Sequence, residues 1–262
     1  MNPIPRLPAP PVSLPIAGPA PEPPDPELVR QLYQVSSATA SATLHKMGIR
    51  QTYIEGPTAR LPGTKVVGPA VTLQFMPQRE DIASGLDQEG AEQKSALWHV
   101  FDAVKPGDVL VVQAFGDAYT GCMGEMLITY FKGLGGVGLV IDGLIRDWPR
   151  VREIGLPLWT RGATPNYASQ GSLFPWAYNV PIACSRVLVL PGDLVIADDD
   201  GAVVVPIRVA PLLLKETLEH EEWETFSRLR LAQGGSLWTY YPLSAEGRRE
   251  YEQWRRENND GK

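Results

Sequence analysis

Short apolar runs separated by glycine or proline recur through the middle of the chain, and they predict a succession of strands. Helical periodicity covers residues 25–47, where Ser36, Ser37 and Ser41 offer breaks, and Pro211–Gln233, which ends at a pair of glycines. The strands are expected near residues 65–75, 108–114, 137–142, 187–190, 194–197 and 202–205. Only one strand–helix–strand step is evident, so the pattern indicates a mixed α/β fold without requiring a plain doubly wound sheet.

The chain begins with a concentration of proline. Eleven of its 25 prolines fall within residues 1–26. Because proline lacks a backbone N–H and fixes φ, this tail is predicted to form neither helix nor sheet and to be extended or disordered. We therefore expect three regions: the tail at 1–26, an α/β core at 27–210, and a C-terminal helix with an aromatic tail at 211–262, placed at a subunit interface.

Composition excludes several classes of protein. At 262 residues and 44% hydrophobic content, the chain is long enough to bury a core. No apolar run approaches the length that spans a bilayer, and the N-terminus lacks the features of a secretory signal. Two cysteines are too few for a disulfide scaffold, and a net charge of −6 argues against general nucleic-acid binding. The expectation is a cytoplasmic enzyme.

An arginine and an aspartate, Arg146 and Asp147, come shortly after the apolar run 137–141. The run predicts a buried strand, and open α/β folds tend to bind ligands where such strands end. Arginine binds carboxylates through two parallel hydrogen bonds, and aspartate suits a hard divalent cation. The pair therefore indicates a site for a metal-chelating oxo-acid. An isolated Arg–Asp pair is also typical of a surface turn closed by an ion pair.

A glycine-rich turn that ends at Gly124 leads into a predicted helix over residues 125–132. A helix N-terminus presents free backbone N–H groups and the positive end of the helix dipole. The amides of Met126 and Leu127 are thus a second means of binding a carboxylate, close in sequence to the Arg–Asp pair. The alternative is an ordinary first turn, in which Glu125 only complements the dipole.

Other catalytic chemistries lack the residues that they require. The three histidines, His45, His99 and His220, have no metal-ligand spacing. Cys122 has no histidine placed to activate it and is predicted to be a small buried residue. Lys132 is expected on the surface side of its helix, which disfavours catalysis through a Schiff base. Of the catalytic chemistries considered, metal-dependent catalysis remains.

The late helix carries a carboxylate on its apolar face. At 100° per residue, Leu218, Phe226 and Leu229 share one face, and Glu222 falls between them. A carboxylate in such a place requires a partner. Glu222 is therefore a candidate functional carboxylate; the alternatives are a rim glutamate and a member of a structural ion pair.

Several blocks in collinear order resemble one family. The blocks are Gly124–Leu127, then residues 135–147 and 155–162, together with residues 68–72, 105–112 and 191–206. They are similar to the RraA-like group, which includes the 4-hydroxy-4-methyl-2-oxoglutarate and 4-carboxy-4-hydroxy-2-oxoadipate aldolases. The resemblance implies that family's fold, an α/β/β/α sandwich with a swivelling-domain-like core, here with a C-terminal helical extension.

The resemblance also implies a metal-dependent retro-aldol cleavage. A 4-hydroxy-2-oxo acid would give pyruvate and a second carbonyl compound, with decarboxylation of oxaloacetate as a side activity. Mg²⁺ or Mn²⁺ would be ligated by Asp147 and, through water, by Glu125. Arg146 would clamp the keto acid and stabilise the enolate.

Two further parts of the implied site bind the substrate. Gly124 and the amides of Met126 and Leu127 would hold its carboxylate. In the aldolases, an acidic residue from the C-terminal region of a neighbouring subunit completes the site, and Glu222 is the candidate here. A homotrimer or hexamer is therefore expected.

The chain also departs from the aldolase pattern. Glu125 stands where many of those aldolases carry aspartate, and the charged stretch Arg79–Asp81 is either a solvated loop or part of the substrate entrance. Two alternatives stay open. One is a non-catalytic, protein-binding regulator of RNA degradation, and the other is a lyase of this family that acts on a sugar-derived 2-oxo acid.

Overall fold

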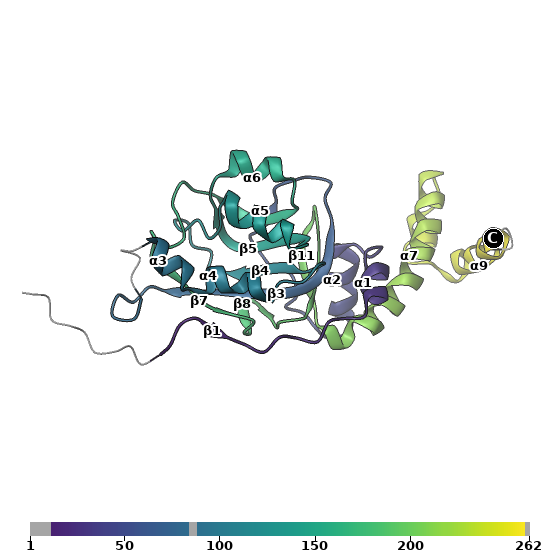
Figure 1. Ribbon diagram of the computed structural model, residues 1–262. Helices are drawn as coiled ribbons and strands as arrows, with labels where there is room; N and C mark the ends of the chain where they lie inside the picture. The colour runs from purple at the N-terminus through teal and green to yellow at the C-terminus, as the bar shows by residue number, and fades with distance from the viewer. Residues whose placement is uncertain (1–11, 84–87, 260–262) are drawn as a thin grey trace, which may run out of the picture. The chain divides into compact units, whose positions relative to one another are not determined.

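Four parallel strands form the centre of the structure, a computed structural model that describes residues 12–83 and 88–259. Their order is β3 (Val66–Pro77), β4 (Val109–Gln113), β5 (Gly138–Ile145) and β6 (Leu158–Ala163) (Figure 1). The strands are rich in valine, leucine and isoleucine and are buried almost throughout, as is typical of parallel strands covered on both faces. Antiparallel strands flank them: β7 (Leu173–Tyr178) beside β3, and β2 (Thr58–Ala59) beside β6.

A second layer of strands covers one face of this sheet. The N-terminal part of β3 pairs with β10 (Leu194–Asp198), which forms an antiparallel hairpin with β11 (Gly201–Val205). A separate hairpin joins β8 (Ile182–Cys184) and β9 (Val187–Val189). Because β3 pairs with β10 at one end and with β4 further along, it belongs to both layers.

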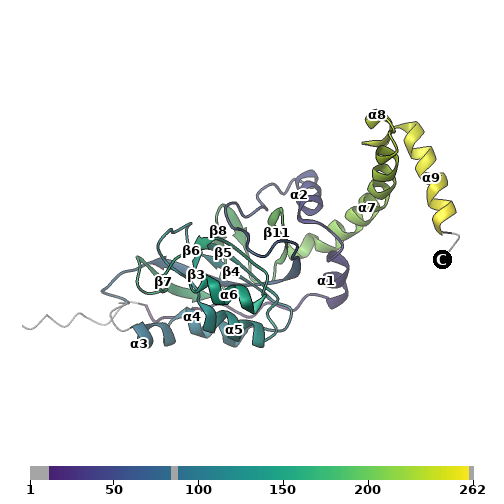
Figure 2. The same ribbon diagram turned by 90° about the horizontal axis from the view of Figure 1, so that it is seen from above.

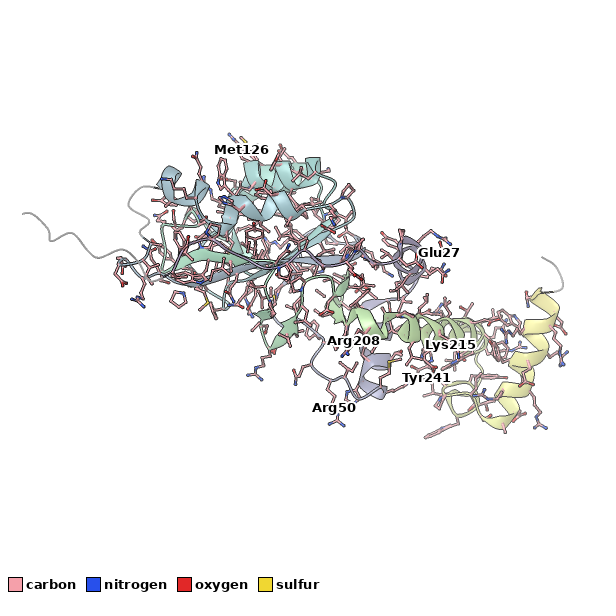
Figure 3. All side chains as sticks on the ribbon, turned by 60° about the horizontal axis from the view of Figure 1, so that its bottom comes forward. Glu27, Arg50, Met126, Arg208, Lys215 and Tyr241 are labelled. Carbon is pink, nitrogen blue, oxygen red and sulfur yellow. The ribbon has the colours of Figure 1, made fainter. Side chains whose placement is uncertain are left out.

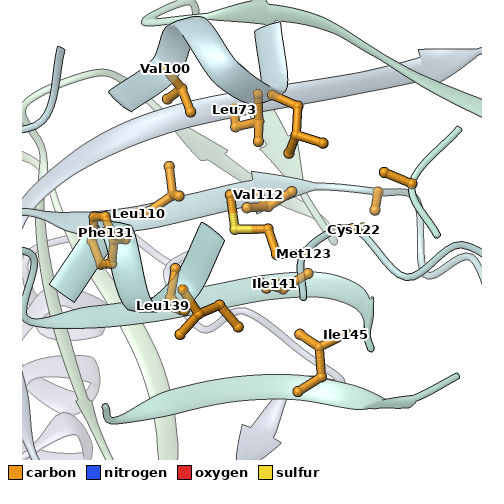
Figure 4. Close-up of a cluster of buried hydrophobic side chains, with 14 of the residues drawn as sticks. Leu73, Val100, Leu110, Val112, Cys122, Met123, Phe131, Leu139, Ile141 and Ile145 are labelled. Carbon is orange, nitrogen blue, oxygen red and sulfur yellow. The ribbon is translucent and has the colours of Figure 1, made fainter. Parts of the chain in front are cut away.

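Two hydrophobic cores lie on the opposite faces of the central sheet. Leu110 and Val112 of β4 belong to one core, while Val109 and Val111 belong to the other, as the alternation of a strand requires. The first core lies between the sheet and the helices and contains Phe131 (Figure 4). The second lies between the two layers of strands.

Helices form the outer layers. On one face of the central sheet lie α4 (Ala96–His99), the short 3₁₀ helix η1 (Val100–Ala103), α5 (Glu125–Gly133) and α6 (Trp148–Ile154). On the other side, α2 (Ser37–Lys46) packs on the β10–β11 hairpin (Figure 2). The layers therefore run helix, sheet, sheet, helix. The remaining helices of this unit are α1 (Pro26–Leu32), α3 (Gln88–Gln93) and the 3₁₀ helix η2 (Ile207–Val209).

The strands expected from the apolar runs are confirmed, and the structure extends one of them and adds others. The strand expected over residues 137–142 runs from Gly138 to Ile145, and Asp142 within it is buried. The helical region expected over residues 25–47 forms two helices, α1 and α2, and the possible break at Ser36 is confirmed, because Ser36 caps the second helix. Four further strands, β2, β6, β7 and β8, were not expected.

The proline-rich tail contains a strand, contrary to expectation. Ile16–Ala17 forms β1, which pairs in parallel with β7, and Gly18 N donates to Tyr178 O over 2.9 Å. The two residues lie between prolines, so their N–H groups are available for pairing. Residues 1–11 of the tail lie outside the described residues.

The chain forms two compact units, Met1–Pro211 and Leu212–Lys262. The helix α7 (Ala210–Ala232) leads into the second unit, which also holds α8 (Leu237–Tyr240) and α9 (Ala245–Asn259). The expected aromatic tail is thus a helix, and Tyr240, Tyr251 and Trp254 surround Phe226 with ring centroids 5.6–6.0 Å from it. Among the described residues, no helix is long and apolar enough to cross a membrane.

The buried Trp159 links the two strand layers. Its ring is fully buried in the second core, and Nε1 donates to Asp198 O over 2.8 Å. Trp159→Ala should lower the free energy of unfolding by about 3–5 kcal/mol, because it removes a large core side chain and leaves a cavity. Urea denaturation would measure the loss. Leu188→Ala, at a side chain that is 64% exposed, is the control. Equal losses in both variants would contradict this assignment.

Burial raises the pKa of Asp108 to about 6, although its carboxylate accepts from Lys105 N. The folded pKa lies above the unfolded value, so the group stabilises the fold below about pH 4, and this contribution is lost as the pH rises through 6. The stability of wild type relative to Asp108→Asn should therefore fall by roughly 2–3 kcal/mol between pH 4 and 7. Urea denaturation across that range tests this, with the exposed Asp102→Asn as control. Parallel profiles for the two variants would refute it.

Candidate active site

The segment before α5 runs beside the end of β5. Gly121 forms a parallel bridge with Leu144, and Cys122 N donates to Leu144 O over 2.8 Å. Arg146 N in turn donates to Met123 O over 2.9 Å. Because these bonds align the two segments, the first residues of α5 come to lie next to the residues that follow β5.

Asp147 lies at this junction in a left-handed conformation. Its φ and ψ are 59° and 32°, and it precedes the first residue of α6. One carboxylate oxygen, Oδ2, accepts from Arg146 Nε at 3.0 Å and lies 3.4 Å from Glu125 N. Aspartate tolerates this conformation better than most residues, yet such strain clusters at functional sites. The backbone therefore holds the carboxylate toward the start of α5.

Arg146 keeps part of its guanidinium available. Its side chain is 35% exposed, and its ion pair with Asp147 uses Nε. Among the described residues, the two terminal nitrogens have no hydrogen-bond partner, so the planar end that binds carboxylates bidentately is accessible.

Glu125 opens α5 and is held by a second arginine. Arg150 Nη1 of α6 donates to Glu125 Oε2 over 3.1 Å, and this bond raises the pKa of Arg150. The Glu125 side chain is 26% exposed, so the bond is only partly screened. The contact ties the two helices together across the site.

The N-terminus of α5 presents its backbone as predicted. Gly124 precedes the helix in an extended conformation and has no side chain with which to cap it; of the amides in the first turn, the Asp147 carboxylate accepts only from Glu125 N. The amides of the first turn therefore lack an intrahelical partner. The side chain of Met126 is 71% exposed and points outward (Figure 3).

A pocket of about 210 Å³ brings most of the expected residues together. Gly124, Met126, Leu127, Arg146 and Asp147 all line it. Glu125 does not, but its backbone nitrogen lies near the Asp147 carboxylate.

Sequence reasoning missed the other walls of the pocket. They come from α3, α4 and the segment after β6: Glu92, Leu97, Trp98, Tyr167 and Ala168. No local pattern marks these residues, because only the packing of distant elements brings them to the end of β5. The Arg79–Asp81 stretch is an exposed, ion-paired loop and does not line the pocket.

Glu222 has a partner in its own unit. Arg255 Nε of α9 donates to Glu222 Oε1 over 2.8 Å, and the carboxylate is 32% exposed. The expected apolar stripe is also wrong in part, since Phe226 is buried but Leu218 and Leu229 are 39% and 42% exposed. The argument from an unpaired charge therefore no longer holds, and a role at a neighbouring subunit's site stays a prediction.

The burial of Cys122 is confirmed, and burial raises the pKa of its thiol. The exposed Lys132 side chain contacts Ile154 O, so its ammonium is bound away from the pocket. Both observations agree with the exclusion of thiol and Schiff-base chemistry.

Comparisons with known proteins identify the family. The family model RraA-like, described as Aldolase/RraA, matches residues 34–204. The chain belongs to the RraA-like family. The matched residues include β3, β5 and every residue that lines the pocket, because the lining residues run from Glu92 to Ala168.

Two solved structures are similar to this RraA-like chain. Streptomyces coelicolor RraAS2, described as an unusual member of the RNase ES inhibitor RraA protein family, is 60% identical, with a TM-score of 0.74. The match covers 80% of this chain and 99% of that one. An uncharacterized protein from Pseudomonas syringae pv. tomato is 25% identical, with a TM-score of 0.70 over 84% of this chain and 98% of that one.

A curated relative from Halalkalibacterium halodurans carries 4-hydroxy-4-methyl-2-oxoglutarate aldolase as a provisional name. It is 35% identical over 142 residues, which make up 54% of this chain. The chain spans only 60% of the length of that relative.

Gly124 allows the side chains of Arg146 and Asp147 to lie close to the backbone before α5. A Cβ there would lie 2.6 Å from Asp147 Oδ2 and 3.0 Å from Arg146 Cγ. Gly124→Ala should displace both side chains and lower any turnover at this site on the order of 100-fold, because small misplacements of reacting groups are costly. A crystal structure of the variant would show the displacement. Gly133→Ala is the control, since a Cβ there meets nothing within 4 Å. Unmoved side chains in Gly124→Ala would contradict the expected clash.

Proposed function

We propose that this protein is a divalent-metal-dependent lyase, which cleaves a 4-hydroxy-2-oxo acid to pyruvate and a second carbonyl compound. The observation that carries the proposal is the convergence of Arg146, Asp147 and the uncapped N-terminus of α5 on one pocket. A guanidinium and free amides bind the two ends of a 2-oxo acid head, and the neighbouring carboxylate suits a cation.

The donor set fits a hydrated Mg²⁺ or Mn²⁺. Asp147 and Glu125 supply two partly exposed carboxylates. Within the described ranges, no group of three or more histidine, cysteine or acidic residues could hold a metal. Magnesium typically takes one or two carboxylates and keeps several waters, so two suffice. Asp147 would hold the ion directly and Glu125 would hold it through water; the bound ion would polarise the 2-oxo group as a Lewis acid.

The residues of the chain position the substrate. The terminal nitrogens of Arg146 would bind the 2-oxo acid head, and the amides of Met126 and Leu127 would bind its carboxylate. Arg150 donates to Glu125 Oε2 and so fixes the orientation of that carboxylate.

Cleavage breaks the C3–C4 bond of the substrate. The electron pair of that bond moves onto the pyruvate fragment as its enolate, and the proton of the 4-hydroxyl passes to water in the pocket. Arg146 stabilises the negative charge that develops on the enolate oxygen. Protonation at C3 then gives pyruvate. Oxaloacetate would lose carbon dioxide through the same enolate, so decarboxylation is the expected side activity.

A second candidate is inhibition of an RNA-degrading enzyme by direct binding. The observation that favours it is the 60% identity with RraAS2 over 99% of that protein. Such a role places no demand on the accessible end of Arg146, whereas the lyase requires it. A homo-oligomer that brings Glu222 to a neighbouring site belongs to the lyase proposal, as does a sugar-derived 2-oxo acid as the substrate.

Metal removal and Arg146→Lys test the lyase together. Chelator should abolish pyruvate release from 4-hydroxy-2-oxo acids, and Mg²⁺ or Mn²⁺ should restore it. Arg146→Lys should lower kcat by about 100-fold or more, because lysine retains the charge but loses the planar fork. Arg152→Lys, on an exposed position of α6 outside the pocket, is the matched control.

Two outcomes would reject the lyase. One is full activity in chelator, and the other is wild-type kinetics for Arg146→Lys. Absence of pyruvate release, combined with inhibition of an RNase E-type enzyme by both wild type and Arg146→Lys, would establish the second candidate instead.

A further inference from the structure

The pocket beside Arg146 has walls of two kinds. Arg146, Asp147 and the backbone at Gly124 form a polar part. Leu97 and Trp98 of α4, with Met126 and Leu127 of α5 and Ala168, form an apolar part. Trp98 and Met126 are 46% and 71% exposed and line the same pocket, and apolar side chains that are exposed together are typical of a ligand-binding groove. A substrate with an apolar group would cover them.

Glu92 introduces a negative charge into the same pocket. It comes from α3, and Ser169 Oγ donates to its Oε1 over 3.1 Å. Among the described residues, its second carboxylate oxygen has no hydrogen-bond partner. Because Glu92 lines the pocket, its carboxylate would contact a ligand that is bound there.

The charges in the pocket disfavour a second carboxylate on the substrate. Of the described lining residues, Arg146 is the only cation, whereas Asp147 and Glu92 are both acidic. Arg146 already pairs with Asp147 and, in the proposed lyase, binds the 2-oxo acid head. A distal carboxylate would find no cation in this lining and would be repelled by Glu92.

We propose that the substrate is a 4-hydroxy-2-oxo acid with a single carboxylate and an uncharged, apolar group beyond C4, and that Glu92 determines this specificity by rejecting a distal carboxylate. The inference rests on the proposed lyase function. It sets this chain apart from an oxoglutarate aldolase, whose substrate carries a carboxylate at each end.

Two substrates of similar shape test the inference. 4-Hydroxy-5-methyl-2-oxohexanoate carries an isopropyl group beyond C4, and 4-hydroxy-2-oxoglutarate carries a carboxylate of nearly the same size. Both release pyruvate, so one assay serves for both. The wild-type kcat/KM should be about tenfold higher for the isopropyl substrate, because a carboxylate near Glu92 meets a like charge in a partly screened pocket.

Glu92→Gln isolates the charge. Glutamine retains the shape, and its amide oxygen still accepts from Ser169. The ratio of the two kcat/KM values should shift about tenfold toward the dicarboxylate. Glu55→Gln removes the same charge at an exposed position outside the pocket and should leave the ratio at its wild-type value.

Exchange of the pyruvate methyl protons with solvent deuterium, followed by NMR, tests the lyase separately from the substrate specificity. Pyruvate carries no group beyond C3, so Glu92 has no distal group to reject in this assay. Exchange together with the expected ratio and its shift in Glu92→Gln supports the specificity. Exchange with a preference for the dicarboxylate, or an unchanged ratio in Glu92→Gln, overturns the specificity and leaves the lyase standing. Equal losses toward both substrates in Glu92→Gln overturn it too, since Glu92 would then act in catalysis. If neither exchange nor cleavage occurs, the lyase itself is refuted and the specificity loses its basis.

Discussion

Two backbone hydrogen bonds tie residues 121–123 to the end of β5, and the candidate site depends on them. Cys122 N donates to Leu144 O, and Arg146 N donates to Met123 O. They place the start of α5 beside Arg146 and Asp147, although 21 residues separate Glu125 from Arg146. Because Gly124 has no Cβ, the Asp147 carboxylate can lie close to the backbone at the start of α5. Local structure alone could not hold the side chains of Arg146 and Asp147 this close to the start of α5.

The layers of the fold keep this junction rigid. Ile128 and Phe131 of α5 are fully buried in the first core, which fixes the helix against β4 and β5. On the opposite face, Trp159 packs in the second core and donates to Asp198 O, at the end of β10. The strands that carry the site are therefore covered on both sides, and the strained Asp147 is supported by the surrounding packing.

The fold is shared by proteins described by different functions, so the fold alone does not decide what this chain does. RraAS2 is similar over its whole length and is described within an RNase inhibitor family, while a more distant relative has an aldolase name. The side chains in the pocket are more specific. An accessible guanidinium, a carboxylate and helix amides suit a 2-oxo acid. In the proposed lyase, the acidic and aromatic walls of the pocket would restrict what that acid carries beyond C4.

The sequence by itself determined the elements whose pattern is local. The apolar run 137–141 marked β5, and Gly133 marked the end of α5, because strand burial and helix termination depend on neighbouring residues. Tertiary structure alone decided the β1–β7 pairing, the Glu222–Arg255 ion pair and the Glu92 wall of the pocket. Each of these joins segments that are far apart along the chain. A local pattern shows which face of an element is buried, but the partner that buries it is selected only when the whole chain packs.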